Sequence, residues 1–127
     1  MVQVKVYGNR RVWGERRSEV SDALHAALVG AWRIPDDKRF HRFLLLEDGD
    51  LVAPRSESYL MIEVVAFAGR SREAKRELVR RMYDDVAPAL GLAADDLELV
   101  VIESPAESWG IRGRSGDELT LNYAVDV

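Results

Sequence analysis

The chain has 127 residues, a net charge of −4 and no cysteine. This length suits one domain with a core that needs no covalent staples, and 47% hydrophobic with 31% charged residues is ordinary for a globular protein. The absence of cysteine excludes disulfides, thiolate catalysis and cysteine-based metal sites. The arginines are scattered among acidic residues, which argues against a nucleic-acid interface. No apolar run approaches membrane-spanning length and the alternating start is unlike a signal peptide, so we expect a cytoplasmic protein that does not bind membranes.

The first half of the chain predicts a strand, a helix and a second strand. Residues 2–7 alternate as a strand does and end at Gly8-Asn9, and a loop through Trp13-Gly14 follows. A helix is predicted over residues 15–32, because apolar side chains recur there at helical spacing: Val20, Leu24, Ala27, Leu28 and Ala31. Pro35 ends this segment, and residues 40–47 predict the second strand. Residues 51–58 are typical of an irregular excursion with a short hairpin arm.

The second half repeats this plan. Residues 60–68 form an apolar run of the length expected for a strand buried on both faces. A helix is predicted over residues 72–90, with an inner stripe at intervals of four: Ala74, Leu78, Met82, Val86 and Leu90. Pro88 lies inside this pattern and should kink or fray the last turn. Residues 97–103 predict the fourth strand, residues 109–113 a hairpin-like segment, and the alternation over residues 119–125 an added strand.

Two tandem β-α-β units therefore make up the chain. We expect one domain over residues 1–127, with pseudo-repeats at 1–58 and 59–113 and a tail at 114–127. The predicted fold class is α+β or α/β, a four-stranded sheet with two helices on one face. A ferredoxin-like split sandwich and the double β-α-β sandwich of the tautomerases both satisfy this pattern, so the pattern alone leaves the two architectures open.

The junction between the third strand and the second helix predicts an anion site. Gly69 ends the strand, and Ser71 is a residue type that caps a helix. Arg70 then lies at a corner near the positive end of a helix dipole, where a guanidinium and backbone N–H groups together can hold a carboxylate or phosphate.

Other charged residues have simpler interpretations. We expect Arg76, Arg80 and Arg81 on the solvent face of the second helix, with Glu73 and Glu77 as partners. His25 adjoins an apolar helix stripe and His41 begins a strand; two histidines without a spacing motif do not predict a metal site, and we expect no cofactor.

The order and spacing of several segments resemble the tautomerase superfamily, and within it the long members that include malonate semialdehyde decarboxylase. The resemblance covers residues 2 to about 113 and rests on five pieces of sequence: the strand starting at residue 2, residues 21–28 (SDALHAAL), 34–40 (IPDDKRF), 68–75 (AGRSREAK) and 108–111 (SWGI). It implies a homotrimer with active sites near the amino termini of the first strands.

The chain departs from this family where the chemistry resides. The family uses an amino-terminal proline as base or, when protonated, as acid, whereas this sequence has Val2 there, and the free amine belongs to Met1. Lys38 replaces an aspartate that orients water or substrate in decarboxylase-like relatives, and Ala68 replaces a further arginine. Arg70 and Trp109 keep their family positions.

The resulting hypothesis is a tautomerase-superfamily protein that is inactive or very weak in proline-dependent chemistry. Arg70, Lys38 and Trp109 would bind a small carboxylate such as a 2-oxo acid beside the Met1 amine, whose pKa neighbouring cations should lower. One alternative is an active isomerase or lyase that uses other groups, such as Tyr7 or Glu63. Another is a non-enzymatic ferredoxin-like sensor or assembly module.

Overall fold

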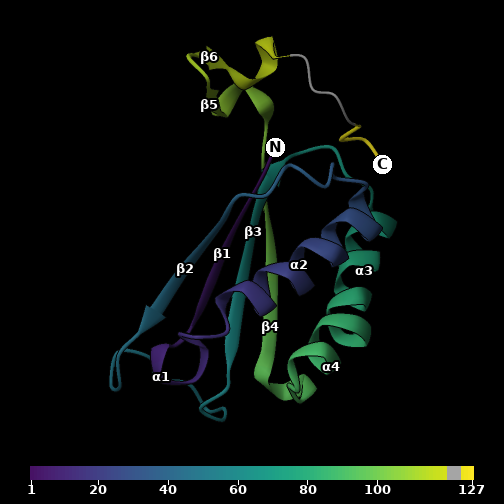
Figure 1. The fold of residues 1–127 in the computed structure, drawn as a ribbon. Coiled ribbons are helices and arrows are strands. Elements are labelled where there is room, and N and C mark those ends of the chain that lie inside the picture. The colour runs from purple at the N-terminus through teal and green to yellow at the C-terminus, as the bar shows by residue number, and fades with distance from the viewer. Residues whose placement is uncertain (120–123) are drawn as a thin grey trace.

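The computed structural model describes residues 1–119 and 124–127, and a four-stranded mixed sheet lies at its centre (Figure 1). The strands are β1 (Val2–Asn9), β2 (His41–Leu46), β3 (Leu60–Phe67) and β4 (Leu97–Ser104), in the order β2-β1-β3-β4. β1 is parallel to β2, β3 is parallel to β4, and the central pair β1 and β3 is antiparallel. Each half of the chain therefore contributes one parallel pair.

The strand order decides between the two architectures left open by the sequence. In a split β-α-β unit another strand lies between the two parallel strands, whereas here β1 and β2 are direct neighbours, as are β3 and β4. The tautomerase-type sandwich is thus confirmed, and the ferredoxin-like alternative is wrong.

The helices cover one face of this sheet (Figure 1). They are α1 (Arg10–Trp13), α2 (Arg17–Trp32), α3 (Arg72–Arg81) and α4 (Ala87–Leu90), with a π-helical turn at Met82–Val86 between the last two. The stripes predicted for both long helices are confirmed: all of their members are buried except Ala31, which is partly buried against the same core. Among residues 1–119 and 124–127, no helix covers the opposite face of the sheet.

The helical segment from α3 to α4 accommodates Pro88 through one wider turn, and the segment does not end there. Proline has no N–H to continue the i→i−4 ladder, and its ring crowds the preceding turn. The chain responds with the π-helical turn, at whose end the Ala87 N–H donates to the Met82 carbonyl five residues earlier. Met82 and Val86 stay buried through this turn, so the apolar stripe continues to Leu90.

Trp13 was expected in a loop and instead belongs to α1. Its side chain is 1% exposed, and its indole N–H donates to the Ser58 carbonyl at 3.2 Å. This bond attaches the excursion over residues 51–58 to the body of the protein. The hairpin arm expected in that excursion does not form.

The tail after β4 contains short elements near the end of the sheet where the chain begins (Figure 1). The hairpin-like segment is confirmed as β5 (Gly110–Ile111) and β6 (Arg114–Ser115), flanked by 3₁₀ turns at Ala106–Ser108 and Gly116–Glu118; a further 3₁₀ turn, Ala94–Asp96, precedes β4. Most of the strand expected over residues 119–125 falls at 120–123, outside the described residues.

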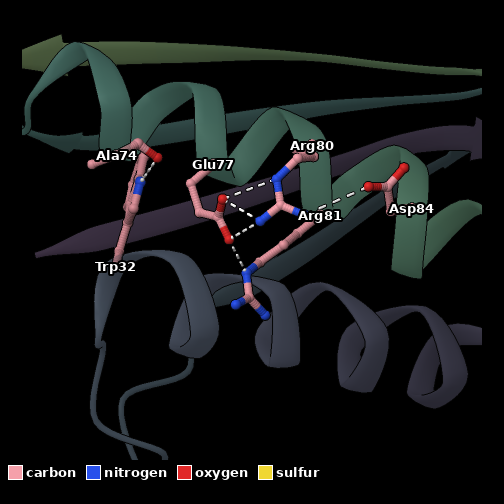
Figure 2. Close-up of polar contacts among 6 residues, drawn as sticks. All are labelled: Trp32, Ala74, Glu77, Arg80, Arg81 and Asp84. Carbon is pink, nitrogen blue, oxygen red and sulfur yellow. Dashed lines mark hydrogen bonds and ion pairs between the residues drawn. The ribbon is translucent and has the colours of Figure 1, made fainter.

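Ion pairs run along α3 and the π-helical turn that follows it (Figure 2). Glu77 accepts hydrogen bonds from Arg80 and from Arg81, the latter at 2.8 Å, and Arg80 pairs with Asp84 at 3.6 Å. Arg81 was expected on the solvent face, and this prediction is wrong. Its side chain is half-buried and reaches toward α2, where the guanidinium occupies the space that a side chain at Gly30 would fill.

Candidate functional site

The start of the chain lies beside the end of β3. Val2 pairs with Ala66, and the Phe67 N–H donates to the Met1 carbonyl at 3.1 Å. Because β3 and β4 are parallel, Phe67 in turn lies opposite Ser104, at the end of β4. The topology therefore brings the amino terminus to the corner at residues 68–71, as the duplicated half-fold predicts.

Arg70 at this corner is buried rather than displayed on the surface. The residue is 5% exposed, its Cζ atom lies 4.2 Å from the ring centre of Trp32, and its Nη1 donates to the Phe67 carbonyl at 3.3 Å. Trp32 is itself fixed, since its indole N–H donates to the Ala74 carbonyl at 3.0 Å (Figure 2). A guanidinium stacked on an indole keeps its charge and loses conformational freedom, which suits it to recognise an anion.

The backbone of the corner is occupied by internal partners. Ser71 caps α3 as predicted, because its Oγ accepts from the Ala74 N–H at 3.1 Å, and Gly69 adopts a φ of +137° that favours glycine. The Ser71 N–H donates to the Val127 oxygen at 2.9 Å. Lys75, and then the N–H groups of Gly69 and Arg70, hold the pKa of the Glu103 carboxyl below its usual range. The N–H groups of the corner thus have partners within the chain, and their binding of a ligand together with Arg70 stays a prediction.

The amine of Met1 is strongly perturbed by this environment. Met1 is 8% exposed, and burial followed by the nearby charge of Arg70 lowers the amine pKa from 8.0 to about 5. The direction expected from neighbouring cations is confirmed, but burial is the larger cause. At neutral pH this amine is uncharged and can accept a proton.

The other two expected site residues lie at the same end of the sheet. Trp109 is half-buried and packs edge-on against Phe67, with ring centres 5.2 Å apart, and its Nε1 is buried without a hydrogen-bond partner among the described residues. Lys38 lies in the turn that leads into β2, where its N–H donates to the Pro35 carbonyl at 3.0 Å. The Val4 N–H donates to the Phe40 carbonyl, so the start of β2 runs beside that of β1.

Tyr7 and Glu63 do not belong to this site. The Tyr7 hydroxyl donates to Glu63 at 3.1 Å, and Glu63 pairs with Lys5 in mid-strand, on the sheet face without helices. Tyr7 is six residues along β1 from Met1, a separation of roughly 20 Å at ~3.3 Å per residue. The geometry gives these two groups no role next to Arg70.

Two further features bear on the function of the chain. No helix within residues 1–119 and 124–127 is long and apolar enough to cross a membrane. Over the same ranges, no group of three or more histidine, aspartate or glutamate side chains is placed to hold a metal ion.

The amine titration can be measured directly. We expect the amine of a chain that begins with Met1 to titrate near pH 5 by NMR after ¹³C-methylation, and Arg70→Ala to raise this pKa only in part, because burial remains. Since the folded pKa lies below the unfolded value, the unfolded chain binds more protons between about pH 5 and 8, and this group makes the free energy of unfolding rise with pH over that window.

Arg76→Ala, on the exposed side of α3, is the matched control and should leave the amine pKa unchanged. A wild-type amine that titrates near 8 would show that the amino terminus is solvated and away from Arg70.

Comparison with known proteins places this geometry in a family. The model of a family described as tautomerase enzyme matches residues 38–112. A structure of FG41 malonate semialdehyde decarboxylase inhibited by 3-bromopropiolate is 26% identical, with a TM-score of 0.80 over 94% of this chain and 98% of that one. A member of the cis-3-chloroacrylic acid dehalogenase family is 23% identical (TM-score 0.79; 89% and 82% covered), and a fused 4-OT, described as an asymmetric trimer, is 19% identical (TM-score 0.79; 91% and 96% covered). With more than half of its length matched by the family model and its fold shared with these structures, the chain belongs to the tautomerase superfamily.

Proposed function

We propose that this protein binds a small carboxylate such as a 2-oxo acid at the amino-terminal edge of its sheet, and that it carries out proline-dependent tautomerisation, decarboxylation or dehalogenation very weakly or not at all. The observation that supports this is the Met1 amine, buried beside Arg70 and followed by Val2 where superfamily members resembling this chain have their proline. In this proposal the chain keeps the family's cation, Arg70, and has the primary amine of Met1 in place of the catalytic proline amine.

The pKa of the Met1 amine limits this group to accepting protons. With a pKa of about 5 it is unprotonated at neutral pH, so it cannot supply the proton that a decarboxylation or dehalogenation needs. It can accept a proton, but an amine with so low a pKa is a weak base, and a primary amine lacks the ring that fixes the proline nitrogen. Slow enol-to-keto conversion of an aryl pyruvate is the reaction that these groups still permit.

The roles of the ligand-binding residues follow from their charge and position. Arg70 pairs with the ligand carboxylate, since a guanidinium matches the two oxygens with two N–H groups. Lys38 adds positive charge just before β2, where decarboxylase-like relatives have an aspartate. An aspartate there would repel a carboxylate ligand. Trp109 offers its indole N–H, which has no hydrogen-bond partner in the part of the chain that the structure describes, and an aromatic wall next to Phe67.

Turnover of an enol aryl pyruvate tests this function. We expect the wild-type chain to be slower by about 100-fold or more than a Val2→Pro variant from which Met1 has been removed, because a placed general acid or base contributes ~10²–10⁴-fold. Val2→Ala with Met1 removed is the matched control, since it exposes a primary amine at the same place, and it should stay slow. Wild-type turnover within about tenfold of the processed Val2→Pro variant would refute the loss of catalysis.

We also propose that the chain forms a homotrimer through the sheet face without helices. Three of its side chains remain 38–44% exposed, namely Leu44, Val100 and Ile102, and Met61 and Val65 lie between them across the sheet. Exposed apolar side chains grouped on one sheet face, around the Lys5–Glu63 ion pair, are typical of an interaction surface. The related fused 4-OT structure, which is a trimer, supports a copy of the same chain as the partner.

The assembly state tests this surface. We expect light scattering after gel filtration to give a trimer, and Ile102→Glu to dissociate it, because burying an unpaired carboxylate costs roughly 2–5 kcal/mol at each interface. Val52→Glu is the control, since Val52 is 93% exposed in the excursion outside the sheet. A monomeric wild type, or an Ile102→Glu trimer of undiminished stability, would show that this face is not the interface.

A further inference from the structure

A second polar site lies between α2 and the edge strand β2, apart from Arg70 and Met1. It is an open pocket of about 290 Å³, at the lower end of the size range for small-molecule sites. Its lining combines cations, hydroxyls, a carboxylate, an imidazole and one aromatic wall: Arg17, Ser18, Ser21, Asp22, Arg39, His41 and Phe43.

The serine and the histidine in this pocket are hydrogen-bonded to each other. Ser21 Oγ lies 2.8 Å from His41 Nδ1, and Arg39 Nη1 donates to the same Oγ at 3.2 Å. The guanidinium has donors only, so the hydroxyl accepts from Arg39; in the His41 tautomer that carries its proton on Nε2, the hydroxyl proton points to Nδ1. A serine whose proton faces an imidazole nitrogen and whose oxygen faces a cation has the arrangement of an activated nucleophile.

Both partners of Ser21 are held in place. Arg39 also donates to Asp22 at 2.6 Å, which fixes the guanidinium next to the hydroxyl and compensates the aspartate charge. His41 packs edge-on against His25, whose Nε2 is hydrogen-bonded to the Asp36 carbonyl at 2.9 Å. Burial, and then the charges of His25 and Arg39, lower the pKa of His41 to about 4, so its ring is neutral and able to accept a proton at pH 7.

We propose that Ser21 is a nucleophile that accepts the acyl group of small aromatic esters bearing a carboxylate, with His41 as its base and Arg17 and Arg39 as the contacts for negative charge. Phe43 supplies the apolar wall for the acyl ring. This site does not depend on the amino terminus, and it adds an acyl-transfer activity to the carboxylate binding proposed above.

The reaction balances with water as the second substrate. Ser21 Oγ bonds to the ester carbonyl carbon while its proton passes to His41 Nδ1, and Arg39 faces the charge that develops on the carbonyl oxygen. The carbon–oxygen bond to the leaving alcohol breaks, and that alcohol takes the proton from His41. Water then attacks the acyl-serine, gives its proton to His41, and releases the carboxylic acid as the proton returns to Ser21. Because His41 is a weak base, we expect its activation of water to be slow, so that with an activated ester deacylation is slower than acylation and the acyl-serine accumulates.

The test uses the full-length protein and mono-4-nitrophenyl terephthalate, an activated ester whose acyl group carries a carboxylate. We expect a burst of 4-nitrophenolate and one acyl adduct that peptide mapping places on Ser21. Ser21→Ala should abolish the adduct, and His41→Gln should slow it by ~100-fold or more. The uncharged 4-nitrophenyl ester of 4-methylbenzoic acid, which has nearly the same shape, should react several-fold more slowly.

Ser56→Ala is the matched control, because Ser56 is an exposed serine in the excursion over residues 51–58 and does not line this pocket, and this variant should acylate at the wild-type rate. Circular dichroism of Ser21→Ala checks that the variant is folded. Absence of an adduct, an adduct on Ser18 or the Met1 amine that persists in Ser21→Ala, or equal labelling of urea-unfolded protein would each overturn the proposal.

Discussion

Trp32 donates its indole N–H to the carbonyl of Ala74 and lies beneath the guanidinium of Arg70. One side chain thereby joins the end of α2 to the first turn of α3 and supports the cation at the corner between β3 and α3. The two halves of the chain meet here, since α2 belongs to the first β-α-β unit and Arg70 to the second. The antiparallel pairing of β1 with β3 then places Met1 at the same corner, so the site follows from how the two units are joined.

The same surroundings leave the Arg70 guanidinium charged and the Met1 amine uncharged at neutral pH. A guanidinium stays charged when buried on an aromatic ring, because its pKa is far above neutrality. An α-amine in the same surroundings loses its proton, because burial and the neighbouring charge both disfavour the ammonium form. In the function proposed here, the corner keeps a charge suited to binding a carboxylate and lacks the protonated amine that proline-dependent reactions would need. Because a fold does not determine its chemistry, the proposed function allows a carboxylate to be bound without being converted.

The sequence predicted most of the fold because its patterns were local. Apolar spacing in the two long helices and the alternation of the strands depend on neighbouring residues, and duplication of the plan limited the topology to two candidates. The order of the strands depends on pairing between distant segments, so only the coordinates selected one. The α1 helix was missed because four residues carry no periodic signal, and the π-helical turn because Pro88 can be accommodated in more than one way.

The site was predictable only in outline. Gly69-Arg70-Ser71 marked the corner by residue type, but nothing local indicated that Glu103 and Val127 would occupy its backbone N–H groups. The depth of Met1 depends on tertiary packing, and so does the approach of His41 to Ser21, which are 20 residues apart. To predict the proposed second site, the sequence would have had to indicate that Ser21 of α2 faces the strand that begins with His41.

We propose that the fold directs the start of the chain and Arg70 toward the same small carboxylate. A crystal structure of the protein saturated with phenylpyruvate tests it most directly. We predict that the ligand carboxylate contacts the Arg70 guanidinium, with the keto and adjacent carbon atoms facing the Met1 nitrogen. Ligand density elsewhere in every subunit, or a Met1 nitrogen turned away from Arg70, would contradict the account.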